Sequence, residues 1–121
     1  MATILIVDDY AVSLRLLNHI LLRANHKPVT ASNGLQALDV LEQEPVDLVI
    51  LDIDMPEING IEVLRRIRAD ARFTTLPVIM LTASGDDEDR KQAEASGANG
   101  FLTKPTSSDE IIAIINQHLD T

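Results

Sequence analysis

Apolar residues gather in five short runs that alternate along the chain with longer amphipathic segments. The runs span residues 3–7, 28–31, 46–51, 77–81 and 100–103. Stretches such as LVIL and VIML lack the polar alternation of a half-exposed strand, so they are typical of parallel strands with both faces covered. The hydrophobic pattern therefore predicts five buried parallel strands.

Helical periodicity fills the segments between these runs. Apolar stripes lie at Leu14, Leu17, Ile20, Leu21 and Ala24, then at Leu35, Leu38 and Leu41, then at Ile61, Leu64 and Ile67, and last at Ile111, Ile112, Ile114, Ile115 and Leu119. Ser107 and Glu110 precede the last stripe at the spacing of a capping box. Alternating strands and helices predict a doubly wound α/β sandwich with right-handed crossovers.

The fourth predicted helix differs from the others. Residues 86–96 offer only Ala93 and Ala95 as apolar groups, and the segment begins with acidic residues that complement a helix dipole. A helix with so little apolar surface is weakly anchored. We expect this element to move.

Composition limits the classes of protein to be considered. The 121 residues, of which 45% are hydrophobic and 24% charged, fit one globular domain, 1–121. No apolar run is long enough to enter a membrane, and MATILIVDD lacks the basic start of a secretory signal, so we predict a cytoplasmic protein. Without cysteine, disulfides and thiolate chemistry are excluded. The net charge of −9 disfavours direct nucleic-acid binding and favours a protein or a cation as partner.

Polar residues follow four of the five predicted strands. They are Asp8 and Asp9 after the first run, Asp52 and Asp54 after the third, Thr82 after the fourth and Lys104 after the fifth. In open α/β sheets, ligands bind outside the carboxyl ends of the strands. The sequence therefore predicts a site at this edge of the sheet.

The acidic residues of this set require a compensating charge. If the first and third strands are neighbours, Asp8, Asp9 and Asp52 converge, and two carboxylates about 4 Å apart repel by about 4 kcal/mol at an effective dielectric of 20. Mg²⁺ accepts carboxylates while keeping waters and phosphate oxygens. With Lys104 and Thr82 nearby, the set indicates phosphoryl chemistry with a carboxylate nucleophile. Each piece alone has a structural explanation as a turn, a helix cap or a loop lysine.

Four segments, ILIVDD, LVILDIDMPEINGIEVLRRIR, LPVIMLTA and GANGFLTKP, together resemble the receiver domain of two-component response regulators over nearly the whole chain. The resemblance implies a flavodoxin-like (βα)5 fold with strand order 2-1-3-4-5. It assigns Asp52 as the phosphoacceptor, and Asp9 and Asp52 as side-chain ligands of Mg²⁺. Asp54 matches the position that gives its backbone carbonyl to the metal, and Asp8 the residue that reaches it through water.

The same resemblance assigns the residues of a switch. Thr82 matches the hydroxyl that turns toward the phosphoryl group, Lys104 the lysine that pairs with it, and Phe101 the aromatic switch residue, expected to turn from exposed to buried. The family often has a cis bond before the proline that matches Pro105.

The implied function is that of a signalling switch that catalyses its own phosphorylation and dephosphorylation. It is not expected to be an enzyme that acts on other molecules. A sensor histidine kinase or a histidine phosphotransfer protein would donate the phosphoryl group. The surface of the fourth helix, fifth strand and fifth helix would then bind a downstream protein target. The sequence names neither the kinase nor the target, and leaves phosphoryl lifetime, dimerisation and membership of a longer chain open.

Two other functions fit parts of this pattern. The Asp52–Asp54 pair resembles the nucleophile and acid of haloacid-dehalogenase-type phosphatases, although that motif belongs near the start of a longer domain and lacks a proline where Pro56 stands. A degenerate receiver that only scaffolds a partner is the second alternative, disfavoured by the intact site residues.

The remaining charged groups are predicted to be structural. His19, His26 and His118 are scattered away from the proposed site and fit surface or capping positions. The RRIR segment of residues 65–68 is expected to form a solvated face that pairs with Glu62 or Asp70.

Overall fold

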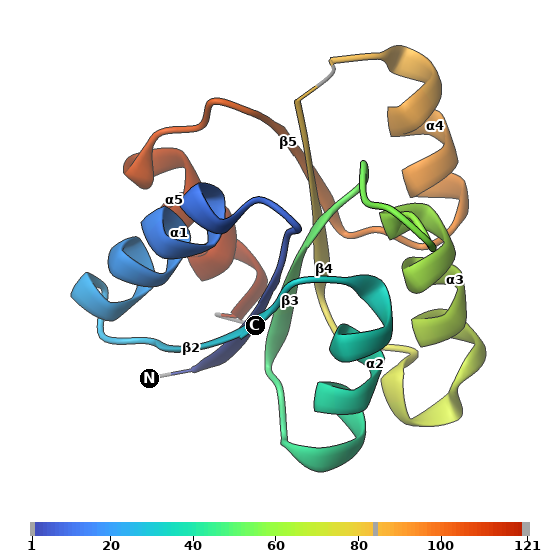
Figure 1. Cartoon of the computed structure of the whole chain (residues 1–121), viewed down its shortest axis with the longest axis horizontal. Helices are drawn as coiled ribbons and strands as arrows, with labels where there is room; N and C mark the ends of the chain where they lie inside the picture. The colour runs from blue at the N-terminus through green and yellow to red at the C-terminus, as the bar shows by residue number, and fades with distance from the viewer. Residues whose placement is uncertain (1, 84, 120–121) are drawn as a thin grey trace.

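The computed structural model describes residues 2–83 and 85–119. Five parallel strands form one sheet in the order β2-β1-β3-β4-β5, with helices on both faces (Figure 1). The strands are β1 (Thr3–Val7), β2 (Lys27–Ala31), β3 (Leu48–Asp52), β4 (Val78–Thr82) and β5 (Gly100–Thr103). The helices are α1 (Ala11–Arg23), α2 (Gly34–Gln43), α3 (Gly60–Ala69), the 3-10 turn η1 (Ala71–Phe73), α4 (Asp87–Ala95) and α5 (Ser108–Leu119). The predicted fold class and strand order are confirmed.

Two central strands extend one residue further toward the functional edge than the apolar runs predict. β3 ends at Asp52 and β4 at Thr82, because Asp52 stays in register with Leu81 across the ladder. At its other end β3 begins two residues later than predicted. There the backbone N–H of Asp47 donates to the carbonyl of Thr3 at 2.8 Å and its side chain accepts from the N–H of Thr3 at 2.8 Å. Asp52 and Thr82 are therefore held by the sheet itself.

The sheet separates two hydrophobic clusters. α1 and α5 cover one face, and α2, α3 and α4 cover the other (Figure 1). Every residue of β3 and β4 is buried, and alternate side chains of β3 enter opposite clusters, with Ile50 on the α1 side and Val49 and Leu51 on the α3 side. Coverage of both faces explains why these strands are continuously apolar.

Side chains cap the starts of α5 and α4, and the cap of α5 is the predicted one. The Ser107 hydroxyl accepts from the Glu110 N–H at 3.1 Å, while the Glu110 carboxylate accepts from the Ser107 N–H at 3.3 Å, which completes the capping box before α5. Asp86 caps α4 by accepting from the N–H of Glu88. Ala93 is the one buried residue of α4, which confirms the weak apolar anchoring predicted for this helix.

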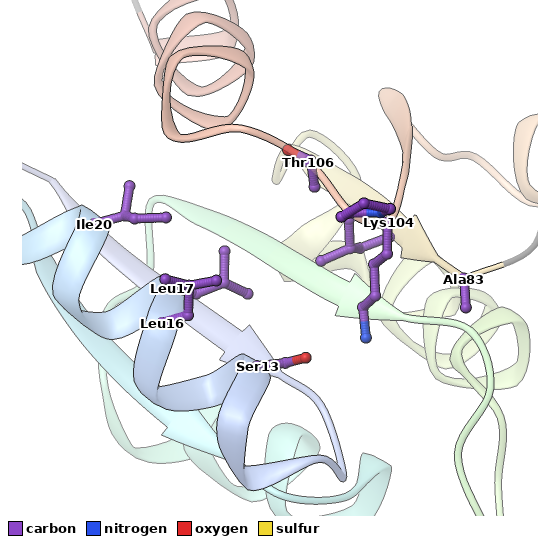
Figure 2. Close-up of a pocket in the computed structure, with 9 residues that line it drawn as sticks. Ser13, Leu16, Leu17, Ile20, Ala83, Lys104 and Thr106 are labelled. Atoms are coloured by element: carbon purple, nitrogen blue, oxygen red, sulfur yellow. The ribbon is translucent and has the colours of Figure 1, made fainter.

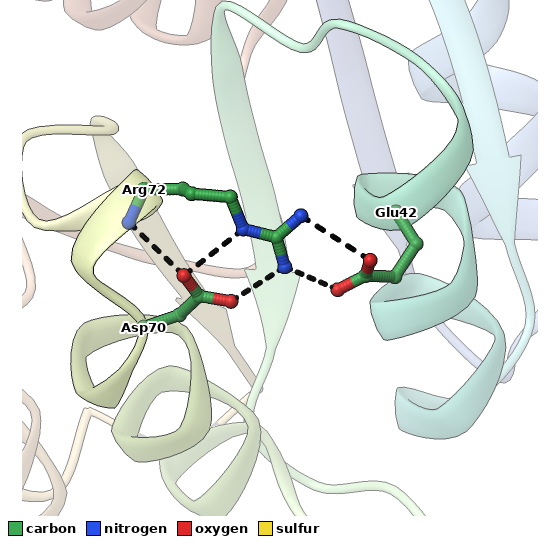
Figure 3. Close-up of polar contacts among 3 residues, drawn as sticks. All are labelled: Glu42, Asp70 and Arg72. Carbon is green, nitrogen blue, oxygen red and sulfur yellow. Dashed lines mark hydrogen bonds and ion pairs between the residues drawn. The ribbon is translucent and has the colours of Figure 1, made fainter.

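An arginine at the opposite end of the sheet from these caps ties two segments together (Figure 3). Arg72 forms ion pairs with Glu42 at the end of α2 and with Asp70 at 2.7 Å, and its guanidinium also lies 4.9 Å from the centre of the Phe73 ring. The hydrogen bonds from Arg72 hold the pKa of Asp70 at about 2. Asp70 thus pairs with Arg72 and not, as one predicted pairing had it, with the RRIR segment.

The basic RRIR segment divides into solvent-exposed and packed arginines. Arg66 pairs with Glu62 at 3.1 Å, as predicted for a solvated face. Arg68 instead packs against the α4–β5 connection, where its guanidinium donates to the carbonyls of Gly97 at 3.0 Å and Phe73 at 2.8 Å and to Asn99 Oδ1 at 2.7 Å. Burial lowers the pKa of Arg68. For Arg68 the prediction of a solvated face was wrong.

Replacing Arg68 with methionine is expected to lower the free energy of unfolding by about 1–3 kcal/mol, because two backbone carbonyls and one amide lose a charged donor. Urea unfolding measures this loss. Arg65→Met on the exposed face of the same helix is the matched control and is expected to change stability by less than about 0.5 kcal/mol. Equal losses in the two variants would contradict the structural role assigned to Arg68.

Among the described residues, no helix combines the length and the apolar character needed to cross a bilayer.

Candidate functional site

The carboxyl ends of four strands bring the predicted polar residues to one edge of the sheet. Asp8 follows β1, Asp52 and Thr82 end β3 and β4, and Lys104 follows β5. Backbone hydrogen bonds continue the ladder at this edge, since the N–H of Lys104 donates to the carbonyl of Thr82 at 2.6 Å and the N–H of Asp8 to that of Ala31 at 3.2 Å. The site is thus built on the rigid frame of the sheet.

Three carboxylates meet at this edge. Asp8, Asp9 and Asp52 each offer an oxygen, and these atoms all lie within 4.8 Å of one another. Asp8 is 1% and Asp52 4% exposed, whereas Asp9 is exposed to solvent. The predicted convergence of the three acids is confirmed. Asp8 and Asp52 are shielded from solvent, whereas Asp9 is accessible to it.

Lys104 provides positive charge inside this cluster. Its ammonium Nζ lies 2.6 Å from Asp8 Oδ2 and 3.7 Å from Asp52 Oδ1. The sequence interpretation paired the lysine with a phosphoryl group on Asp52 and did not foresee Asp8 as its nearer partner. One ammonium among three carboxylates leaves a negative surplus.

That surplus is reflected in the protonation of Asp52. The pKa of Asp52 is raised from 3.8 to about 7, first by burial and then by the negative charges of Asp8, Asp9 and Asp54, which together outweigh the lowering by Lys104. The carboxyl group is therefore poised to change its charge near neutral pH. An additional cation beside it would favour the ionised, nucleophilic form.

Asp54 and Thr82 make a contact that the sequence did not reveal. The Thr82 hydroxyl donates to Asp54 Oδ2 at 3.4 Å, and Thr82 is fully buried while Asp54 is exposed. The resemblance to receiver domains gave Asp54 a role only through its backbone carbonyl, as a ligand of the metal. At 3.4 Å this bond is long and weak by geometric criteria.

The segment after β3 brings the start of α3 against the backbone of Asp52. The N–H of Gly60 donates to the carbonyl of Ile53 at 2.8 Å, and a Cβ atom added to Gly60 would lie 2.1 Å from the carbonyl oxygen of Asp52. Asn59 caps the helix by accepting from the N–H of Glu62 at 3.0 Å. Only glycine allows this approach.

Phe101 on β5 is half-buried, so it occupies neither of the two extremes expected for a switch residue. The guanidinium of Arg90 on α4 lies 5.1 Å from the centre of its ring, within cation–π range. Phe101, Arg90 and Ala93, the buried residue of α4, all line a small cavity of about 160 Å³. The bond between Lys104 and Pro105 is cis, as the resemblance led us to expect.

The histidines lie elsewhere. His26 accepts from the N–H of Ala2 at 3.2 Å, and His118 contacts the carbonyls of Ile114 and Asn99. His19 lines a groove between α1 and α5. Over the described part of the chain, the acidic trio is the one group with metal-ligand spacing, and none of the three histidines belongs to it.

The donor set of the trio fits a hard divalent cation. All the available groups are carboxylate oxygens, one of them exposed and two buried, and the cluster carries surplus negative charge. Mg²⁺ binds through one or two carboxylates and keeps sites for water and phosphate oxygens. The residues present therefore suit Mg²⁺ better than a soft metal that needs sulfur or nitrogen ligands.

Comparison with known proteins agrees with this geometry. The family model of the response regulator receiver domain matches residues 4–116. The chain belongs to this family. Protein PilH of Pseudomonas aeruginosa is 34% identical over 116 residues that cover 96% of both chains.

Two further relatives show the range of proteins in which such receiver domains occur. The transcriptional regulatory protein KdpE of Mycobacterium tuberculosis is 39% identical over 93% of the chain, which spans 49% of its length. A solved receiver domain of the sensor histidine kinase PA1611 from Pseudomonas aeruginosa PAO1, described with a magnesium ion coordinated in the active site cleft, superimposes with a TM-score of 0.92. It is 27% identical and covers 99% of this chain and 98% of its own.

The protein is thus a receiver domain of two-component signalling, a class of signalling switch. Family membership over residues 4–116 favours this assignment over the dehalogenase-type phosphatase suggested by Asp52 and Asp54.

Proposed function

We propose that this receiver domain accepts a phosphoryl group on Asp52 from a phosphohistidine, in a reaction that depends on Mg²⁺. The donor is a sensor histidine kinase or a histidine phosphotransfer protein. The observation that carries the proposal is the buried Asp52 carboxylate, which lies beside Asp8, Asp9 and the Lys104 ammonium with a pKa raised to about 7.

Transfer is a substitution at phosphorus. An oxygen of Asp52 forms the new P–O bond, while the P–N bond of the phosphohistidine breaks and leaves its electron pair on the imidazole nitrogen. Asp8, Asp9 and Asp52, with the backbone carbonyl of Asp54, would hold Mg²⁺, which supplies positive charge to the phosphoryl oxygens. The magnesium ion named for the PA1611 receiver domain supports this assignment.

Lys104 and Thr82 act on the product. The Lys104 ammonium, 3.7 Å from Asp52, is placed to pair with a phosphoryl oxygen. The buried Thr82 hydroxyl exchanges its 3.4 Å bond to Asp54 for a shorter bond to the phosphoryl group. Water later hydrolyses the acyl phosphate at the same site, which returns the domain to its resting state.

The signal leaves through the surface of α4, β5 and α5. Movement of the Thr82 hydroxyl frees space toward β5, where Phe101 is only half-buried, and α4 is anchored by a single buried alanine. A downstream protein target binds the rearranged surface. A shift from 1:99 to 99:1 needs about 5.5 kcal/mol of differential stabilisation, which a few charge-assisted bonds to the phosphoryl group supply.

Incubation with acetyl phosphate tests the proposal without knowledge of the kinase. We expect intact-protein mass spectrometry to record the mass of one added phosphoryl group in the presence of Mg²⁺, and none after chelation with EDTA. Amide exchange is expected to change over residues 85–104 only in the labelled sample. A folded protein that gains no phosphoryl group under either condition would contradict the proposal and favour a constitutive scaffold.

A further inference from the structure

Three asparagines of the chain are each followed directly by a glycine. The dipeptides are Asn33–Gly34, Asn59–Gly60 and Asn99–Gly100. In such a pair the side-chain amide lies next to a backbone nitrogen that no side chain shields, so this nitrogen is able to attack the amide carbon. The fold decides which of the three pairs reaches the geometry of attack.

The pair at the start of β5 is held by both side-chain and backbone bonds. Asn99 Oδ1 accepts from the Arg68 guanidinium at 2.7 Å and from the N–H of Val78 at 2.9 Å. The N–H of Asn99 donates to the carbonyl of Val78 at 2.9 Å, and Gly100 pairs with Ile79 in the ladder between β4 and β5. Attack at Asn99 therefore requires the edge strand to separate from its neighbours.

The other two asparagines cap helices in the same way. Asn59 Oδ1 accepts from the N–H of Glu62 at 3.0 Å, and Asn33 Oδ1 accepts from the N–H of Gln36 at 2.8 Å. The backbone of both asparagines is extended, with ψ angles of 170° and 171°. A difference in reactivity between them must come from the glycine that follows.

The two glycines differ in what holds them. The N–H of Gly60 donates to the carbonyl of Ile53 at 2.8 Å, and the backbone of Asp52 packs directly against Gly60. Gly34 is the first residue of α2, where the backbone N–H has no partner within the helix. The atoms nearest to a Cβ placed at Gly34 belong to side chains and not to backbone. Rotation of the Gly34 amide needs only the first turn of α2 to open, whereas rotation of the Gly60 amide moves the buried end of β3.

We propose that Asn33 is a site of spontaneous deamidation in the folded protein, and that the fold protects Asn59 and Asn99 from the same reaction. The inference goes beyond the phosphorylation of Asp52 and does not depend on it.

The conversion consumes water and releases ammonia. The nitrogen of Gly34 gives its proton to a base in the solvent and bonds to Cγ of Asn33. The bond between Cγ and the side-chain nitrogen breaks, and this nitrogen takes up a proton and leaves as ammonia. Water then opens the resulting succinimide at either of its carbonyls, which produces aspartate or isoaspartate at position 33.

The two products affect α2 differently. Aspartate accepts from the N–H of Gln36 as asparagine does, and it adds a negative charge that stabilises the start of a helix. Isoaspartate adds a methylene group to the backbone and displaces the cap. We therefore expect faster amide exchange over residues 34–38 in the isoaspartate form.

Either product places a carboxylate in a segment that has none. Residues 10–38 contain arginine and lysine but no aspartate or glutamate. Helix α1 of this segment lines a recess of about 380 Å³ beside Lys104 (Figure 2), and Asn33 is not among the residues that line it. Conversion therefore changes the charge of the segment and leaves the lining of the recess unaltered.

Ageing of the wild-type protein at pH 8, followed by peptide mapping with mass spectrometry, tests the proposal. We expect Asn33 to convert at least about tenfold faster than the other two sites, because opening a helix end costs far less than opening a central strand. In protein unfolded by urea, all three sites are expected to convert at similar rates. Equal rates at the three sites of the folded protein overturn the proposal, as does an unchanged Asn33 after a time in which the unfolded protein has converted.

Asn33→Ser and Asn59→Ser form a matched pair of variants. Serine caps a helix as asparagine does but carries no amide. The acidic species that ageing produces on an anion-exchange column is expected to vanish in Asn33→Ser and to persist in Asn59→Ser. Methylation by an isoaspartate methyltransferase should follow the same pattern. Persistence of both signals in Asn33→Ser places the reaction elsewhere and contradicts the assignment.

Discussion

In the Asp52→Asn variant we expect no phosphoryl adduct with acetyl phosphate and Mg²⁺, together with a metal-free protein that is more stable than wild type at pH 8. An amide cannot form the acyl phosphate, so the adduct is lost completely. The gain in stability has a different origin, which is removal of a carboxylate buried among other acids.

The sign of the pH dependence follows from the raised pKa. Asp52 has a pKa of about 7 in the fold and 3.8 as its ordinary value, so between these limits the unfolded chain releases a proton that the folded chain retains. Wild-type stability therefore falls as pH rises from about 4 to 7 and stays low above. Since one unit of pKa is worth about 1.4 kcal/mol, the loss reaches about 4 kcal/mol at most.

Urea unfolding in EDTA at pH 5 and pH 8 measures this difference. The asparagine variant is expected to be more stable than wild type by about 2–4 kcal/mol at pH 8 and by much less at pH 5. Asp39→Asn, an exposed acid on α2, is the control and should follow the wild-type curve. Parallel curves for wild type and Asp52→Asn would rule out Asp52 as the source of the pH dependence.

In the Gly60→Ala variant we expect a loss of about 3 kcal/mol or more in the free energy of unfolding. The added Cβ would lie 2.1 Å from the carbonyl oxygen of Asp52 and 2.9 Å from the Cα of Ile53. Both are backbone atoms, so no side-chain rotation relieves the overlap. Either α3 or the end of β3 must shift, and a shift of β3 displaces the acceptor.

Thermal and urea unfolding measure the loss, and the labelling rate with acetyl phosphate measures the displacement. Gly85→Ala is the matched control, because a Cβ there meets its nearest neighbour, Thr103, at 3.9 Å. We expect that control to stay within about 0.5 kcal/mol of wild type. A stable Gly60→Ala protein with wild-type labelling would show that α3 can retreat without moving Asp52.

The fold could be predicted from local sequence patterns, because a parallel strand that is buried on both faces appears in the sequence as a continuous apolar run. The first and last strands agree with their runs at residues 3–7 and 100–103. At β3 the limits of the strand differ from those of its apolar run. Asp47, which bonds to Thr3, precedes the strand, and Asp52 continues the ladder although its side chain is polar.

Side-chain partners were less predictable than positions. The convergence of Asp8, Asp9 and Asp52 follows from strand adjacency, but nothing in the sequence separates the 2.6 Å approach of Lys104 to Asp8 from its 3.7 Å distance to Asp52. Such preferences depend on the final placement of flexible side chains.

The packed arginine of α3 illustrates the same limit. Arg68 stands in a basic run whose helical periodicity indicates a solvated face. Its partners Gly97 and Asn99 lie 29 and 31 residues away, and they are brought to it by the return of the chain from α4 to β5. Only the tertiary structure shows that this arginine bonds to the connection that follows α4.

The ion pair between Asp8 and Lys104 joins residues 96 positions apart, which directly follow the first and the last strand. During synthesis from the amino end, the acids of β1 and β3 are made before the lysine that compensates them. Without the connection after β5, which carries Lys104, the three carboxylates at this edge would lack their ammonium partner. The lysine that partly offsets this charge follows the edge strand, so the element that completes the sheet also brings the acceptor site to its resting electrostatic state.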